Sequence, residues 1–195
     1  DFSVAELVRD YYGFENMDNW ARVGRGNDRI YLTTVNHFER NLARKRDTFV
    51  MIGWSASTRW DWPTVEPFKK MPPQDTTWCT TNMEKSIELL DDIAKKKKQR
   101  MHHPELAVVR FYQNIIGLQS YLKANKIPYV FYNSLEPHYF NGKVDHKYWQ
   151  EAIDREHYFK FEYSHHQYCK KHNLFISDSD EHPSAEGHKL WADMV

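Results

Sequence analysis

The stretch Thr48-Phe49-Val50-Met51-Ile52-Gly53-Trp54 decides the fold class of this chain. It is a continuous apolar run bounded by polar residues, which is typical of a β-strand that is buried on both faces. A second run of the same kind is Ile127-Pro128-Tyr129-Val130-Phe131-Tyr132. Such strands belong to sheets whose two faces are covered by helices, so the two runs predict an α/β sandwich with a parallel sheet.

Helical patterns alternate with these runs along the chain. Apolar residues recur at helical spacing in several segments, and the helix-start and helix-stop residues Ser3, Gly13, Pro104 and Asn125 stand at their ends. Helices are therefore expected over residues 2–12, 30–42, 81–100 and 104–123, over much of 145–172, and from Ser184 onward. Short strands are expected at 14–20 and 174–176.

Residues 55–80 are expected to form a long loop. This segment holds several tryptophans and prolines, and long loops in compact domains are usually functional. Trp54, Trp60, Trp62 and Trp78 are candidates for stacking on sugar rings, although packing of the loop explains them equally well. Arg59 follows the end of a strand and is a candidate for binding a substrate carboxylate or phosphate. The alternative for Arg59 is an ion pair with Asp61 or Asp180.

Composition places further limits on function. The chain has 195 residues, and its 27 Lys+Arg balance its 27 Asp+Glu. This length predicts a single domain over residues 1–195, and zero net charge argues against a nucleic-acid-binding protein. No stretch is long and apolar enough to span a membrane, so we expect a soluble protein, and its two cysteines are consistent with a cytoplasmic one.

The cysteine and histidine patterns favour no cofactor and no metal. Cys79 and Cys169 are too few for a disulfide framework, and two reduced thiols are favoured over one long-range disulfide. The adjacent pairs His102-His103 and His165-His166 lack the carboxylate spacing of a metal site.

The segment Asp180-Glu181-His182-Pro183-Ser184-Ala185-Glu186-Gly187-His188 carries the main chemical signal. Pro183 restricts His182 to extended backbone, and Ser184 is a suitable cap for the helix behind it. A carboxylate beside a histidine can hold the imidazole tautomer and stabilise its protonated form, as a general base requires. An ordinary Asp/His turn before a capped helix would show the same residues.

Together with Trp191-Ala192, this segment resembles the last conserved block of the SGNH (GDSL-type) hydrolases. Residues 19–28 resemble the second block of that family, and Ile52-Gly53-Trp54-Ser55 stands where the third block has Gly-x-Asn. The similarity spans nearly the whole chain. It is strongest to a variant of tailed phages and marine bacteria.

The resemblance implies a flavodoxin-like, three-layer αβα sandwich and hydrolysis of acyl or acetyl esters, including esters on carbohydrate. It also implies a role for each matching residue. His182 would be the base and Asp180 the group that orients it, while Gly26, Asn27 and Ser55 would supply the oxyanion hole.

Two features depart from the family pattern. Ser55 replaces the third-block asparagine, and losing an oxyanion donor typically costs about 10²–10³-fold in rate. In addition, the chain has no Gly-Asp-Ser nucleophile block. Ser3 is interpreted as a helix-start residue, so the first, central strand and the nucleophile are expected upstream of Asp1. The alternative to an ester hydrolase is an inactive descendant that serves as a carbohydrate-binding or virion-structural module. A flavin or nucleotide binder is disfavoured because no glycine-rich phosphate loop follows a first strand.

Overall fold

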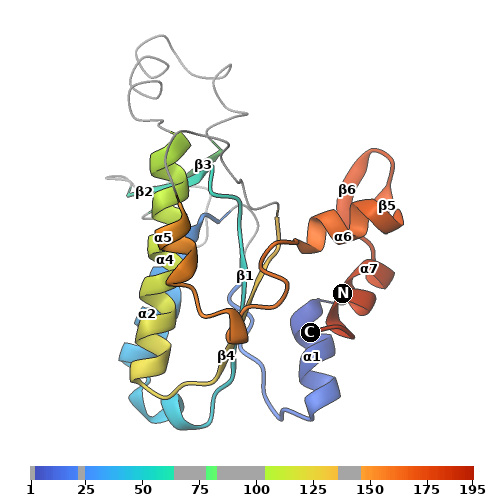
Figure 1. The fold of residues 1–195 in the computed structure, drawn as a ribbon. Coiled ribbons are helices and arrows are strands. Elements are labelled where there is room, and N and C mark those ends of the chain that lie inside the picture. Colours follow the sequence, from blue (N-terminus) through green and yellow to red (C-terminus); the bar gives the residue numbers. More distant parts are fainter. Residues whose placement is uncertain (1–2, 22–24, 64–77, 83–103, 136–145) are drawn as a thin grey trace.

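A computed structural model describes residues 3–21, 25–63, 78–82, 104–135 and 146–195. The expected helix over 81–100 lies outside these residues except for positions 81 and 82. The pair His102-His103 lies wholly outside them. Within them the chain has a mixed α/β structure with one parallel strand pair and two antiparallel pairs (Figure 1).

The two apolar runs form the parallel pair, as predicted. Strand β1 (Val50–Trp54) pairs with β4 (Tyr129–Asn133), in a register that opposes Val50 to Tyr129 and Trp54 to Asn133. Helices lie on both sides of this pair (Figure 1). The continuous apolar character of the strands is explained by burial against both groups of helices.

The main hydrophobic core lies between the strand pair and helices α2 (Asn27–Arg40) and α4 (Pro104–Ala124). Its largest fully buried side chains come from both helices and both strands. They are Phe38, Trp54, Ile115, Leu118, Leu122 and Phe131.

A second hydrophobic cluster lies on the opposite side, where α1 (Val4–Tyr12) packs against α7 (Ala185–Ala192). Ser3 caps α1 through a capping box with Glu6, and Gly13 ends the helix in the left-handed region at φ 70. The expectation that Ser3 starts a helix is therefore confirmed.

The segment after α4 and β4 extends the parallel arrangement. Helix α5 (Lys147–Glu151) and the 3-10 helix η3 (Arg155–His157) lead into residues 158–164, which run alongside β4. Tyr158 and Ser164 form parallel bridges with Phe131 and Asn133. Helix α6 (His165–His172) follows, so the region 145–172 is helical only in part.

Two hairpins complete the described structure, and neither was expected. Strands β2 (Arg59–Pro63) and β3 (Trp78–Asn82) pair within the segment interpreted as a loop. Strand β5 (Phe175–Ser177) pairs antiparallel with β6 (Asp180–Pro183) and does not join the parallel pair. The 3-10 helix η1 (Leu42–Arg46) links α2 to β1.

The predicted strand at Phe14–Trp20 is wrong. These residues form no strand, and Phe14 and Trp20 are 43% and 49% exposed. Glu15 and three residues that favour turns and caps, Asn16, Asp18 and Asn19, separate the apolar ones, so the segment has no apolar face to bury. Among the described residues β1 therefore pairs only with β4.

Membrane insertion of a helix is not indicated by the described structure. None of the helices in these ranges is both long enough and apolar enough to cross a bilayer.

Candidate functional site

Asp180 and His182 form a direct contact within β6. Residues two apart on a strand point to the same face, and here Asp180 Oδ1 lies 2.5 Å from His182 Nδ1. The same carboxylate oxygen accepts the backbone N–H of His182 at 3.1 Å. The hydrogen bond from the His182 side chain, followed by that from its backbone, lowers the pKa of Asp180.

The other ring nitrogen of His182 faces solvent. The His182 side chain is 79% exposed, and no described residue is bonded to its Nε2. A carboxylate at Nδ1 places the proton on that atom, so the lone pair lies on Nε2. The arrangement is an oriented imidazole with one basic nitrogen open to an incoming group.

The residues after His182 hold the hairpin in place. Ser184 N–H donates to the Leu174 carbonyl at 2.8 Å, and the Ser184 hydroxyl caps α7 by accepting Gly187 N–H at 3.2 Å. A Cβ at Gly187 would lie 2.9 Å from both Cys169 Sγ and the Leu174 carbonyl. This glycine therefore allows α7 to approach α6 closely enough to fix the position of β6.

The hairpin lies at the carboxyl ends of the parallel strands. Ser134 N–H, just after β4, donates to the Trp54 carbonyl at 2.9 Å, and Ser134 accepts His166 N–H at 3.1 Å. His166 Nε2 lies 3.7 Å from Glu181 Oε2, next to His182 in β6. This edge is where ligands bind in open α/β sheets.

The loop after β1 is held by Asn27. Its Oδ1 accepts Ser55 N–H at 2.8 Å, and its Nδ2 donates to the carbonyls of Ser55 and Ala56 at 3.1 and 3.2 Å. All three bonds join the start of α2 to the end of β1. The Asn27 amide is therefore already bonded within the protein rather than pointing at a ligand.

Gly26, the other oxyanion-hole candidate of α2, is bonded in the same way. Gly26 N–H donates to Asp61 Oδ1 at 3.2 Å, and Arg29 N–H donates to Asp61 Oδ2 at 3.0 Å. The buried Asp61 carboxylate of β2 thus caps the N-terminus of α2, where free N–H groups attract negative charge. A Cβ at Gly26 would lie 2.7 Å from the Arg59 carbonyl, so only glycine allows this approach.

Trp54 is not a stacking surface for a ligand, contrary to the expectation. It is 0% exposed, and its ring packs edge-on against Phe111 and Phe131 in the main core. Strand β1 is covered on both sides, so an aromatic side chain at its end is taken up by the core. The side chain of Trp60 lies outside the described structure.

Ser55 and Ser57 place buried hydroxyls in the loop after β1. Each is more than nine-tenths buried, and neither Oγ has a hydrogen-bond partner among the residues described. Buried polar groups are normally paired, so these hydroxyls can bond to water or to a ligand. Ser57 lines a cavity of about 10 Å³, which is about the room that one water needs.

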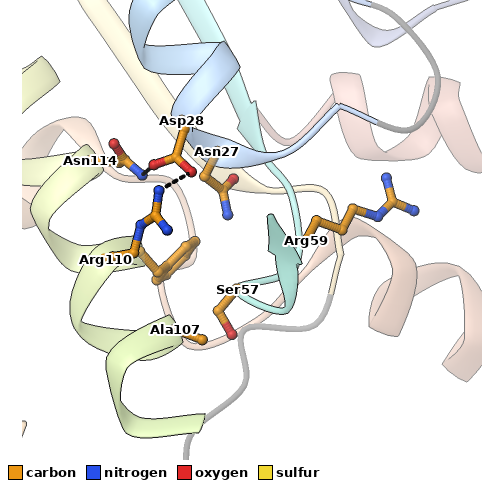
Figure 2. A pocket seen from close by; sticks show the side chains of 8 residues that line it. Asn27, Asp28, Ser57, Arg59, Ala107, Arg110 and Asn114 are labelled. Atoms are coloured by element: carbon orange, nitrogen blue, oxygen red, sulfur yellow. Dashed lines mark hydrogen bonds and ion pairs between the residues drawn. The ribbon is translucent and has the colours of Figure 1, made fainter. Parts of the chain in front are cut away.

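Arg59 lines the same cavity, but Figure 2 shows that its guanidinium points away from the charged pair beside it. That pair is Asp28 and Arg110, which lie 2.7 Å apart, and Asn114 also donates to Asp28 at 3.0 Å. The expected ion pair of Arg59 with Asp61 or Asp180 is not present. Desolvation lowers the pKa of Arg59, but a guanidinium stays charged at neutral pH.

No serine is bonded to His182 among the described residues. Ser3 serves its helix cap, and its hydroxyl bonds to Glu6. Ser177, at the end of β5, and Ser179, in the turn before Asp180, place two exposed hydroxyls 3.2 Å apart, and no sequence pattern marked them as site residues. Cys169 is a free, buried thiol whose pKa is raised to about 11 by desolvation, so it is not a nucleophile near neutral pH.

One group of possible metal ligands was also missed by sequence reasoning. Asp154, Glu156 and His157 place one ligand atom each within 4.8 Å of one another. However, Asp154 Oδ2 already accepts from Lys123 Nζ at 2.6 Å, Tyr129 Oη at 3.0 Å and His157 at 2.8 Å. Burial alone would raise the pKa of Asp154, but these donors lower it to about 2. The cluster is satisfied as an ion-pair network.

The comparison with family models gives one result. The model of a family of unknown function (DUF6071) matches residues 5–195. The chain belongs to this family. No curated protein and no solved structure matches it.

Proposed function

We propose that this member of the family is an ester hydrolase in which His182 acts as the general base. The observation that carries the proposal is the 2.5 Å contact of Asp180 Oδ1 with Nδ1 of an imidazole whose Nε2 is open to solvent. In this geometry Nε2 takes the proton from an attacking hydroxyl. The adjacent carboxylate stabilises the imidazolium that forms.

The location of the pair supports the proposal. Both residues lie on a hairpin that His166 and Ser134 connect to the carboxyl end of β1. The resemblance to SGNH hydrolases adds the finer expectation of a flavodoxin-like αβα sandwich. In that arrangement α2 and α4 would form one outer layer, and α1 and α7 the other.

A second candidate function is a binding module without catalysis, on carbohydrate or in a virion. The specific observation in its favour is that the N–H of Gly26 and the amide of Asn27 bond to Asp61 and to the β1 loop. These are the groups that the resemblance assigns to the oxyanion hole. A site without free oxyanion donors loses what is usually the largest part of acyl-transfer catalysis.

Hydrolysis of p-nitrophenyl acetate by the full chain separates the two candidates. General-base catalysis contributes about 10²–10⁴-fold, so His182→Ala is expected to lower kcat/KM by at least about 100-fold. Asp180→Asn is expected to lower it as well, because the amide no longer favours the reactive tautomer. His172→Ala is the matched control, because His172 is also an exposed histidine.

The control is needed because any exposed imidazole slowly hydrolyses this ester. Equal rates for the chain, His182→Ala and His172→Ala would remove His182 from the mechanism and favour the binding module. Mass spectrometry after treatment with diisopropyl fluorophosphate would then test for a nucleophile, since an activated serine becomes covalently labelled.

A further inference from the structure

The positive charge of Arg59 is not neutralised within the described structure. Its side chain is half-buried, and no described carboxylate forms an ion pair or hydrogen bond with its guanidinium. A charge removed from water without a partner is costly, and partly buried arginines are usually paired. A guanidinium at this edge of the sheet that no described carboxylate neutralises therefore calls for a binding partner.

The acidic residues that were expected to pair with Arg59 are bonded elsewhere. Asp61 accepts the N–H groups of Gly26 and Arg29, and Asp180 accepts from His182. Asp28, which lines the same cavity as Arg59, is held by Arg110 and Asn114.

Two backbone contacts fix the position of Arg59. Its N–H donates to the Ala56 carbonyl at 3.1 Å, which closes a tight turn after β1. Its carbonyl packs against Gly26 at a distance that no Cβ would permit. The residue is therefore held at the start of β2 rather than carried by a free loop, which lowers the entropic cost of binding with its side chain.

The direction of the Arg59 side chain is consistent with binding a group other than the neighbouring pair of Asp28 and Arg110. In Figure 2 the Arg59 guanidinium extends away from Asp28 and Arg110, although Arg59 is one of the residues that line the same cavity as Asp28. The residue belongs to the same carboxyl edge of the strands as the hairpin of His182.

From these observations we infer that Arg59 binds a negatively charged group of a ligand, either a carboxylate or a phosphate. A planar guanidinium matches both groups because it can donate two parallel N–H bonds. If the proposed hydrolase function holds, the substrate is an anionic ester, and Arg59 holds the end that does not react. The anion site itself does not depend on hydrolysis.

Binding measurements on the full chain test the inference directly. Inorganic phosphate and succinate are titrated separately while chemical shifts are followed by NMR, at constant ionic strength set with sodium chloride. We expect saturable binding of at least one anion, and their relative affinities distinguish a phosphate from a carboxylate ligand. Arg59→Gln is expected to weaken binding about tenfold or more, and Arg59→Lys to fall between, because lysine keeps the charge without the bidentate geometry.

Arg40→Gln is the matched control, because Arg40 is an exposed arginine at the opposite end of α2. It is expected to bind both anions like the unaltered chain. Absence of saturable binding, or equal affinities for the unaltered chain and Arg59→Gln, would overturn the inference.

Kinetics separate this inference from the proposed function. With an active hydrolase, Arg59→Gln should raise KM for mono-p-nitrophenyl succinate about tenfold and leave KM for neutral p-nitrophenyl acetate unchanged. Anion binding by Arg59 in a chain that hydrolyses neither ester would refute the hydrolase and keep the anion site. An equal loss of kcat on both esters, without anion binding in the ground state, would instead assign Arg59 to the transition state and refute the inference.

Discussion

Acidification should destabilise this protein through His165. The residue begins α6, is 4% exposed and stacks on Trp191 with ring centroids 5.2 Å apart. The His188 ring lies 5.1 Å away, and His165 Nε2 lies 3.4 Å from the Gly187 carbonyl. Desolvation, together with the neighbouring His188, lowers the pKa of His165 from 6.5 to about 4.

The sign and size of the effect follow from this shift. Between about pH 6.5 and pH 4 the unfolded chain binds a proton at His165 that the folded chain does not, so stability falls as the pH falls. No penalty is present above the unfolded pKa, and the loss is complete near the folded pKa. One pKa unit corresponds to 1.36 kcal/mol, so the lowered pKa predicts a loss of about 3 kcal/mol from this residue.

The assay is urea unfolding followed by tryptophan fluorescence at pH 7, 6, 5 and 4. His165→Phe removes the titrating group and keeps a ring against Trp191. Between pH 6.5 and pH 4, we expect the free energy of unfolding of this variant to fall by about 3 kcal/mol less than that of the unaltered chain. His172→Gln, at an exposed histidine, serves as the control and should keep the original pH dependence.

The comparison isolates His165 because His188, whose pKa is also lowered by desolvation, is present in both proteins. The reasoning would be refuted if His165→Phe and the unaltered chain lost stability in parallel between pH 6.5 and pH 4.

Two further predictions concern packing and helix capping. Asp61→Ala removes the acceptor of two N–H groups in the first turn of α2, so it should lower the free energy of unfolding by about 1–2 kcal/mol, measured by urea denaturation. A larger loss from the exposed Asp10→Ala would contradict this assignment. Gly187→Ala forces a Cβ against Cys169 and should cost about 1–3 kcal/mol, measured by thermal denaturation. Gly13→Ala is its contrast, because space is open there and only the left-handed backbone opposes a side chain, at about 1 kcal/mol. An unchanged melting temperature for Gly187→Ala would show that α6 and α7 adjust to the methyl group.

Local patterns were sufficient for the parallel strands and the capped helices. The run at 48–54 predicted β1 because it holds no charged residue and is apolar from Phe49 onward, and Ser3 with Gly13 marked both ends of α1. The end of α4 differs in detail, because Lys126 rather than Asn125 adopts the left-handed conformation, at φ 56. Such boundaries depend on a few weak contacts and are hard to locate from sequence.

The hairpin of β2 and β3 could not be found from local patterns. Residues 59–63 and 78–82 contain tryptophan and threonine, which favour strands, but their pairing joins segments far apart in the chain. The aromatic residues of Phe14–Trp20 gave the opposite error, because their propensity suggested a strand where no neighbouring strand is available.

The candidate site shows the same division between local and distant contacts. Asp180 and His182 are two residues apart, so the sequence alone predicted a carboxylate beside the histidine, and strand β6, which was not expected, brings both side chains to one face. The bonding of Gly26 could not be foreseen, because its partner Asp61 lies 35 residues away on an unexpected hairpin. Trp54 cannot stack on a ligand, because it is fully buried in the core at the end of β1.

The carboxylate of Asp61 connects three observations at this edge of the sheet. Helix α2 begins directly after its N-cap residue Gly26, which has no side chain to cap the helix, and a glycine there permits the close approach of β2. Asp61 supplies the missing acceptor, and in doing so it fills the place where an oxyanion would bind Gly26 N–H. Hydrogen bonds to a charged group are worth about 1.5–3 kcal/mol, so an anion must displace Asp61 or bind elsewhere. The adjacent Arg59 offers a charge with no such competitor among the described residues, which is why the anion site is assigned to the arginine and not to the helix terminus.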